Sequence, residues 1–278
     1  MKYERIFIDP SDNRTYIDAF VSYSGHTHEA MLILPGGGYG GVCADREGED
    51  VALAYMARGL NCFVLQYRVG TPADRYPRQL IDACRALRYL RTHAAEFHID
   101  PQKIYCVGFS AGGHLAGSLC TMYDRPEVCE ALGTSAEDCR PNGAVLSYPV
   151  VSACVPATHE GSFENLLGKR YAELTDAERV RYSIERNVTD RTPPMFLWHT
   201  AEDDAVPTYG TLALAQTLIE HKIPVRLNLY PYGPHGMALG TKMSAGGYAP
   251  FVDEFANTWV DDSLAFLRSE KAQSAGKE

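Results

Sequence analysis

The pentapeptide Gly108-Phe109-Ser110-Ala111-Gly112 constrains the fold of this 278-residue chain more than any other feature. It follows an apolar, β-branched run at 103–107 and precedes a run compatible with a helix at 113–119. In a G-x-S-x-G pattern the glycines are needed because a sharp strand-to-helix turn strains the serine backbone and leaves no room for neighbouring Cβ atoms. The pattern predicts a nucleophile elbow that exposes the Ser110 hydroxyl. The alternative is a glycine-rich turn whose serine has no chemical role.

The rest of the chain alternates between strand and helix patterns. Apolar runs bounded mostly by Gly, Pro, Asn or Asp predict eight strands, at 4–8, 15–23, 30–35, 61–67, 103–108, 143–150, 194–200 and 225–231. Helical patterns lie between them at 46–58, 78–97, 111–123, 207–221 and 252–269. This alternation predicts an α/β fold, with a mostly parallel eight-stranded sheet and helices on both faces.

Residues 151–193 interrupt that alternation after the sixth strand. The sequence Thr175-Asp176-Ala177-Glu178 is a capping box and predicts a short helix within this segment. We expect one domain over residues 1–278, with 151–193 as an inserted lid or substrate contact. A surface decoration without function is the alternative.

Composition excludes several classes of partner. The net charge is −9 and no basic run is present, so nucleic acid is not an expected partner. The first ten residues lack an apolar signal core, and no stretch approaches the ~18 apolar residues of a membrane span. We therefore expect a cytoplasmic protein without a membrane partner. His26 and His28 are too few ligands for a metal site, and neither a metal nor a cofactor is expected.

A serine hydroxyl becomes a good nucleophile when an imidazole takes its proton and a carboxylate orients that imidazole. Asp203 follows the strand predicted at 194–200, and His235 follows the last strand in the loop Gly233-Pro234-His235-Gly236. Both positions lie past strand C-termini, where α/β sheets place their sites. The order Ser110, Asp203, His235 is that of α/β-hydrolases. Glu202 and Asp204 remain alternatives to Asp203.

His114 and His199 are two other histidines near the predicted site. His114 lies one helical turn after Ser110 and points along the helix, which favours a packing or hydrogen-bonding role over that of the base. His199 ends a strand close to the acidic turn, where it could support the carboxylate.

A glycine loop, Gly36-Gly37-Gly38-Tyr39-Gly40-Gly41, follows the strand predicted at 30–35. Backbone N–H groups in such a loop can join the amide after the nucleophile to bind the oxyanion of an acyl transfer. The predicted donors are the amides of Gly37, Gly38 and Ala111, and the sequence leaves open which glycine donates. The same loop matches G-x-G-x-x-G, but the next strand ends in Gln66-Tyr67-Arg68 rather than in the acid of a dinucleotide site.

Together these motifs resemble the acetyl esterase and feruloyl-esterase-like branch of the α/β-hydrolase family, which is related to hormone-sensitive-lipase-like esterases. The resemblance rests on segments spread over residues ~30–240: Pro35–Tyr39, Asp45–Glu49, Phe63–Arg68, Gly108–His114, Trp198–Asp203 and His235-Gly236. Asp203 also begins an Asp-x-x-Val-Pro turn that resembles the acid turn of this superfamily. One departure is Pro35, because many relatives have His-Gly-Gly-Gly where this chain has Pro-Gly-Gly-Gly.

The resemblance implies a serine esterase without a cofactor. Its expected substrates are small carboxylic esters, often acetyl groups on xylose-containing oligosaccharides. Tyr39 is the expected substrate contact, and Phe163 and Tyr171 are further candidates for a pocket wall. An exopeptidase or amidase, a short-chain lipase and a non-catalytic ligand-binding protein on the same fold are alternatives. The sequence leaves the oligomeric state open, and a homo-oligomer is compatible with it.

Overall fold

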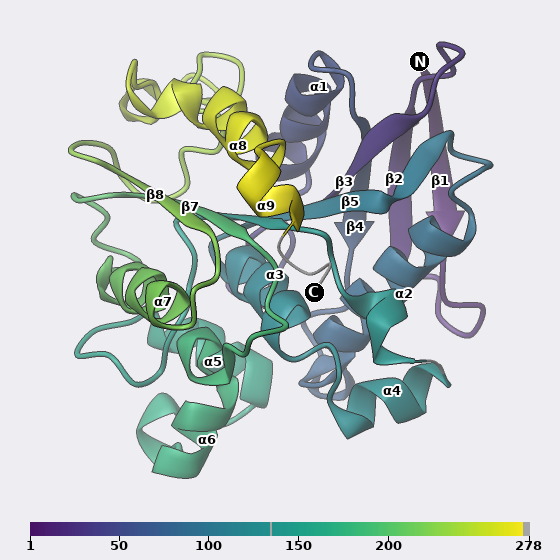
Figure 1. Cartoon of the computed structure of the whole chain (residues 1–278). Coiled ribbons are helices and arrows are strands. Elements are labelled where there is room, and N and C mark those ends of the chain that lie inside the picture. Colours follow the sequence, from purple (N-terminus) through teal and green to yellow (C-terminus); the bar gives the residue numbers. More distant parts are fainter. Residues whose placement is uncertain (134, 275–278) are drawn as a thin grey trace.

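Eight strands form a single sheet in the order β1-β2-β4-β3-β5-β6-β7-β8 (Figure 1). The computed structural model describes residues 1–133 and 135–274. β2 pairs antiparallel with β1 and β4, whereas every other neighbouring pair is parallel. The predicted α/β fold with a mostly parallel eight-stranded sheet is therefore confirmed. The strands are β1 (Lys2–Phe7), β2 (Tyr16–Val21), β3 (His28–Leu34), β4 (Asn61–Gln66), β5 (Ile99–Phe109), β6 (Ala144–Ser147), β7 (Met195–Thr200) and β8 (Val225–Tyr230).

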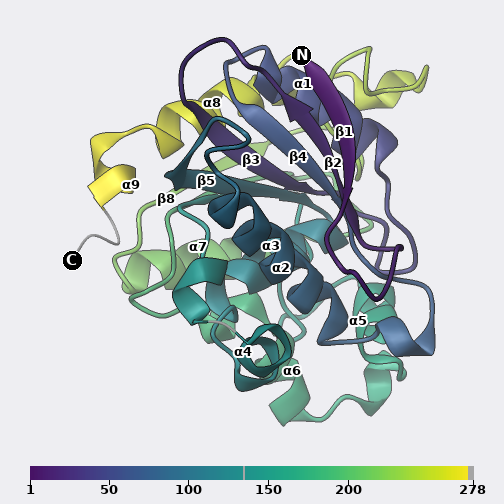
Figure 2. The ribbon, with the colours of Figure 1, turned by 90° about the vertical axis from the view of Figure 1, so that its right-hand side faces the viewer.

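Helices cover both faces of the sheet (Figures 1 and 2). Successive side chains of a strand point to opposite faces, and in β3 Leu32 joins one hydrophobic cluster while Met31 and Ile33 join the other. Both clusters are almost fully buried, which explains why the central strands are continuous apolar runs. The main helices are α1 (Asp50–Met56), α2 (Arg78–Thr92), α3 (Ala111–Thr121), α4 (Pro126–Leu132), α7 (Tyr209–Glu220), α8 (Trp259–Leu267) and α9 (Glu270–Ser274).

Several helical segments differ from the sequence prediction. The pattern at 252–269 is helical as α8 only from Trp259 onward, after two short 3₁₀ turns. The side chain of Asp253 accepts hydrogen bonds from the amides of Phe255 and Ala256, which favours a turn over a continuous helix. α4 was not predicted, although Pro126 at its first position and an αL Gly133 after its end are common helix boundary signals.

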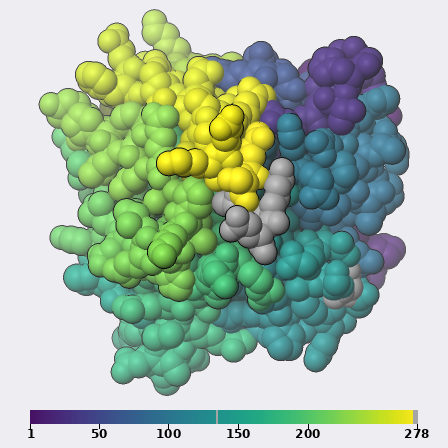
Figure 3. All heavy atoms as spheres, in the orientation of Figure 1, coloured from purple at the N-terminus to yellow at the C-terminus, as the bar shows by residue number. Residues whose placement is uncertain are grey.

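The segment 151–193 lies between β6 and β7, as predicted, and carries α5 (Glu160–Leu167) and α6 (Asp176–Tyr182). Thr175 caps α6, and its side chain and that of Glu178 form the predicted capping box. Both helices lie at the bottom of the molecule in Figure 1, and the same region forms the lower left of the space-filling view in Figure 3. The insertion is tied to the rest of the protein by the amide of Tyr76, which donates to the Leu166 carbonyl at 2.9 Å.

Candidate active site

Ser110 occupies a strained turn between β5 and α3. Its backbone has φ 53° and ψ −120°, a region that non-glycine residues seldom adopt. Three backbone hydrogen bonds hold it there: its amide donates to the Ser147 carbonyl, and its carbonyl accepts from the amides of His114 and Val150. The strain is therefore balanced by contacts with β6 and α3.

The two flanking glycines are required by close backbone approach. A Cβ on Gly108 would lie 2.1 Å from the Gly112 carbonyl oxygen, and one on Gly112 would lie 2.1 Å from the Leu34 carbonyl oxygen. No side chain fits at such distances, so the turn brings the end of β3 directly against the start of α3. The glycine loop that follows β3 thereby lies beside Ser110.

The structure brings Ser110, His235 and Asp203 into one chain of hydrogen bonds. His235 Nε2 lies 2.8 Å from Ser110 Oγ, and His235 Nδ1 lies 2.6 Å from Asp203 Oδ2. Ser110 follows β5, Asp203 follows β7 and His235 follows β8, so the C-terminal ends of three parallel strands supply the three groups. The imidazole is partly exposed, whereas the carboxylate is buried.

Asp203 is held as a carboxylate by its hydrogen bonds. Burial alone would raise its pKa, but hydrogen bonds from His199, His235 and the Val206 amide outweigh that effect and hold the pKa of Asp203 well below its usual range. His199 Nε2 contacts the Val206 carbonyl at 2.8 Å and Asp203 Oδ2 at 3.1 Å. Because a carbonyl can only accept, this nitrogen carries the proton and donates to both oxygens.

The two alternative acids of this turn do not contact His235 in the structure. Glu202 Oε2 instead accepts from the Gly233 amide at 3.2 Å, and Asp204 is exposed. The other oxygen of Asp203, Oδ1, accepts from the amides of Ala205 and Val206. These two bonds orient the Asp203 carboxylate toward the imidazole.

The glycine loop is anchored by a buried acid. Glu47 Oε2 accepts from the Gly36 amide at 2.7 Å, while Glu47 Oε1 accepts from the Tyr148 hydroxyl at 2.8 Å. Burial raises the pKa of this carboxyl above its usual range. Tyr148 also accepts from the Ala238 amide, and its ring packs edge-on against His235 at 5.0 Å. One carboxylate thus braces the glycine loop and the histidine loop together.

Gly37 and Gly38 carry two of the predicted oxyanion donors. Within residues 1–133 and 135–274, neither amide donates a hydrogen bond, whereas the Gly37 carbonyl accepts from the amides of Gly40 and Gly41. Both glycines have positive φ, 132° and 61°, which turns the peptide planes of the loop. Ala111 is the first residue of α3, where an amide has no intrahelical partner.

Tyr39 and His114 connect the glycine loop to the insertion. His114 Nε2 lies 2.7 Å from the Tyr182 carbonyl and therefore donates to it, so Nδ1 accepts from the Tyr39 hydroxyl at 2.9 Å. Burial lowers the pKa of His114 to about 4 and keeps the ring neutral. The supporting role predicted for His114 agrees with these contacts. Phe163 is buried against His114 and Tyr171.

Several residues at this site had no sequence signal. Asn165 on α5 donates from Nδ2 to the Gly38 carbonyl at 2.9 Å, and His159, the residue that caps α5, lies 3.9 Å from a Cβ built on Gly38. Glu47 belongs to the segment Asp45–Glu49, which carried part of the family resemblance. Contacts of this kind join residues that are far apart in the chain, so no local sequence pattern predicts them.

No group of His, Cys, Asp and Glu in the described part of the chain could hold a metal ion. The pair His26 and His28 contacts Ser24 and the Gly59 carbonyl instead. Within the same residues, no helix has the length and apolar character needed to cross a membrane.

Most of this chain is similar in sequence to one protein family and to curated relatives. The chain matches the BD-FAE family over residues 20–218. Endo-1,4-beta-xylanase B of Butyrivibrio fibrisolvens is 36% identical over 89% of this chain and 36% of its own length. The acetylxylan esterase of Xylanibacter ruminicola is 29% identical over 76% of this chain and 42% of its own length. The chain thus spans less than half the length of these two relatives.

Solved structures match over nearly the whole chain. The acetyl ester-xyloside bifunctional hydrolase of Caldicellulosiruptor lactoaceticus is 30% identical, with a TM-score of 0.76 over 95% of this chain and 97% of that one. Further structural neighbours are described as an α/β hydrolase and a carboxylesterase. By sequence and by structure, the chain belongs to the BD-FAE family and has the α/β-hydrolase fold.

Proposed function

We propose that the protein hydrolyses small carboxylic esters with Ser110 as nucleophile, His235 as general base and acid, and Asp203 as the carboxylate that orients His235. The observation that carries the proposal is the continuous hydrogen-bonded chain from Ser110 Oγ through His235 to Asp203 Oδ2. It is supported by the depressed pKa of Asp203, which keeps this group anionic when the imidazole becomes charged.

The geometry supports a two-step reaction. His235 Nε2 takes the proton of Ser110 as Oγ attacks the ester carbonyl, and it then delivers that proton to the departing alcohol oxygen. The acyl group stays on Ser110 until a water molecule, deprotonated by His235, attacks the acyl carbon. The proton then returns to Ser110 Oγ, and the carboxylic acid leaves.

Backbone amides would bind the negative charge that forms on the carbonyl oxygen. The candidates are Gly37 and Gly38, which have no other hydrogen-bond acceptor among the described residues, and Ala111 at the start of α3. Losing one such donor typically costs about 10²–10³ in kcat. Because Glu47 and Asn165 fix the loop through Gly36 and Gly38, the donors would be oriented before substrate binds.

The proposed substrates are acetyl groups on xylo-oligosaccharides or related sugars. Two relatives support this class by name, one an acetylxylan esterase and one an acetyl ester-xyloside hydrolase. We further propose that residues 1–278 act as one domain, in which the insertion 151–193 contacts the substrate. His159 and Asn165 of this insertion lie beside Gly38, which supports that role.

Hydrolysis of p-nitrophenyl acetate, butyrate and octanoate and of acetylated xylo-oligosaccharide tests the proposal. We expect a preference for acetate and for the sugar ester, and a fall of about 10⁴-fold or more in kcat for Ser110→Ala. Ser24→Ala, at an exposed serine, is the matched control and should keep full activity. Turnover that survives in Ser110→Ala would refute the assigned nucleophile, and a preference for octanoate would redirect the substrate class to lipids.

A further inference from the structure

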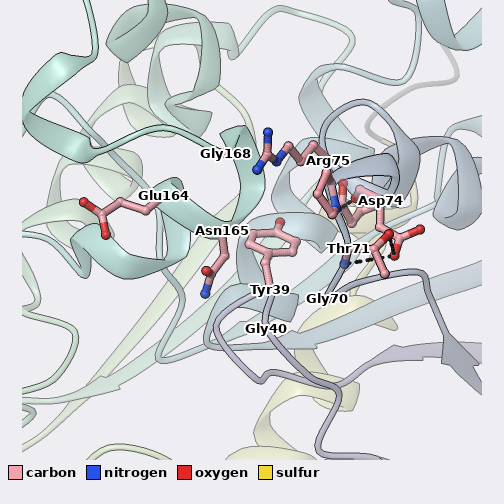
Figure 4. A pocket seen from close by; sticks show the side chains of 11 residues that line it. Tyr39, Gly40, Gly70, Thr71, Asp74, Arg75, Glu164, Asn165 and Gly168 are labelled. Carbon is pink, nitrogen blue, oxygen red and sulfur yellow. Dashed lines mark hydrogen bonds between the residues drawn. The ribbon is translucent and has the colours of Figure 1, made fainter.

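A polar pocket of about 260 Å³ lies beside the glycine loop (Figure 4). Its lining combines Tyr39 and Gly40 of the loop with the segment 70–79 and with residues 164–168 of the insertion. Pockets for drug-sized ligands typically measure about 300–1,000 Å³, so this one suits a single ring rather than an extended chain. The chemistry described above does not use it.

The pocket is close to the proposed reaction centre. Asn165, one of its lining residues, donates to the carbonyl of Gly38, and Gly38 carries one of the proposed oxyanion amides. Gly40 follows two residues later, and consecutive Cα atoms lie 3.8 Å apart, so Gly38 and Gly40 are within about 8 Å of each other. The pocket wall at Gly40 therefore lies within about 8 Å of Gly38, which carries a proposed oxyanion donor.

Arg75 brings a positive charge without a counter-charge to this pocket. Its guanidinium is exposed and forms no ion pair with any residue in 1–133 or 135–274. It packs against Gly168, where a Cβ would come within 1.9 Å of its Cζ. In Figure 4 the guanidinium lies beside Gly168, above the ring of Tyr39. The chain carries a net charge of −9, so this local cation stands out against the overall charge.

The two acids that line the pocket are engaged elsewhere. Asp74 accepts from the hydroxyl of Thr71 and forms an ion pair with Arg14 at 2.9 Å. Glu164 Oε1 accepts from the amide of Tyr171 at 2.8 Å, and in Figure 4 its carboxylate points away from Arg75. Neither acid neutralises the guanidinium, so it is available to an anionic ligand.

Gln79 supplies a second polar group that lacks a partner. Its side chain is 1% exposed and lines the pocket, and its Nε2 donates to the Asp74 carbonyl. The other amide atom, Oε1, has no hydrogen-bond partner among the residues that the structure describes. A buried acceptor without a donor is uncommon in folded proteins. Because Oε1 is sealed from solvent, it belongs to the wall of the pocket and is not a ligand contact.

We propose that this pocket is a subsite for a sugar unit that bears a carboxylate and is joined to the acetylated unit held at Ser110. This inference rests on the proposed function and specifies its substrate. The carboxylate pairs with the guanidinium of Arg75, which matches a carboxylate in a bidentate arrangement. A neutral sugar would lack this contact.

Direct binding to the Ser110→Ala protein tests the subsite without turnover. Calorimetry would compare xylotriose that carries one glucuronic acid branch with unbranched xylotriose. We expect the branched sugar to bind about tenfold more tightly at low salt, an advantage that added salt reduces. Arg75→Gln should remove the advantage. Arg78→Gln, at a neighbouring exposed arginine that does not line the pocket, should keep it. Equal affinity for both sugars would overturn the proposal.

Kinetics on three esters separate this inference from the proposed function. With acetylated forms of both sugars, Arg75→Gln should raise KM about tenfold for the branched ester alone and leave p-nitrophenyl acetate hydrolysis unchanged. Hydrolysis of p-nitrophenyl acetate with no advantage for the branched ester would overturn the subsite and leave the esterase. Arg75-dependent binding without any Ser110-dependent hydrolysis would overturn the esterase and leave the subsite.

Discussion

Stability in mild acid should depend on His114, a buried histidine that takes no part in the proposed proton transfers. The side chain is 2% exposed, donates to the Tyr182 carbonyl and accepts from the Tyr39 hydroxyl. Burial lowers its pKa from 6.5 to about 4, because a charged ring at this position would lose its hydration. In mild acid the unfolded chain therefore binds a proton at His114 more readily than the folded protein does.

The sign and size of the effect follow from this difference. Between pH 6.5 and about pH 4 the unfolded chain binds a proton at His114 that the folded protein does not bind. The free energy of unfolding must then fall as the pH falls through that window, and the contribution levels off below it. A change in pKa from 6.5 to about 4 corresponds to a total loss of about 3 kcal/mol.

Urea unfolding of wild type and His114→Gln at several pH values between about 4 and 7 would measure this loss. Glutamine does not titrate, and its amide nitrogen can still donate to the Tyr182 carbonyl. We expect the variant to be less stable at neutral pH, yet to lose about 3 kcal/mol less than wild type across the window. His221→Gln, at an exposed histidine, should follow the wild-type curve. Parallel curves for wild type and His114→Gln would refute the reasoning.

Two further substitutions test the carboxylates of the site. Asp203→Asn should lower kcat by about 10⁴-fold while its circular dichroism spectrum stays native. Glu202→Gln, in the same turn, is the control and should retain activity. Comparable losses of kcat in both variants would contradict the role assigned to Asp203. Glu47→Ala leaves the Gly36 amide and the Tyr148 hydroxyl without a buried acceptor. We therefore expect this variant to lose roughly 2–5 kcal/mol in the free energy of unfolding. Glu47→Gln keeps one acceptor, so its loss should be smaller. A thermal melt of Glu47→Ala that matched wild type would contradict this expectation.

Much of the fold could be predicted because its signals are local. A strand buried on both faces is a continuous apolar run, so β3 and β5 were visible in the sequence, and the glycines around Ser110 marked the turn between strand and helix. The end of the chain was harder, because one side chain, Asp253, starts a turn inside a stretch with helical periodicity.

The candidate site also combines residues that local motifs predict with residues that only the fold brings together. The order of Ser110, Asp203 and His235 was readable from motifs, although their roles stay predictions until variants are assayed. Sequence could not choose among the three acids of one turn by contact, since the choice depends on the amides that orient Asp203 Oδ1. Nor could it anticipate Asn165, which contacts Gly38 across 127 positions of the chain.

The insertion has a consequence for protein engineering. Its segment 151–193 supplies both the Asn165 side-chain amide that donates to the Gly38 carbonyl and the Tyr182 carbonyl that accepts a hydrogen bond from His114. Exchanging this segment for one from another esterase, in order to change specificity, would also withdraw the supports of the glycine loop and of the helix that follows Ser110. A successful graft must therefore preserve an amide donor at position 165 and the backbone path at position 182.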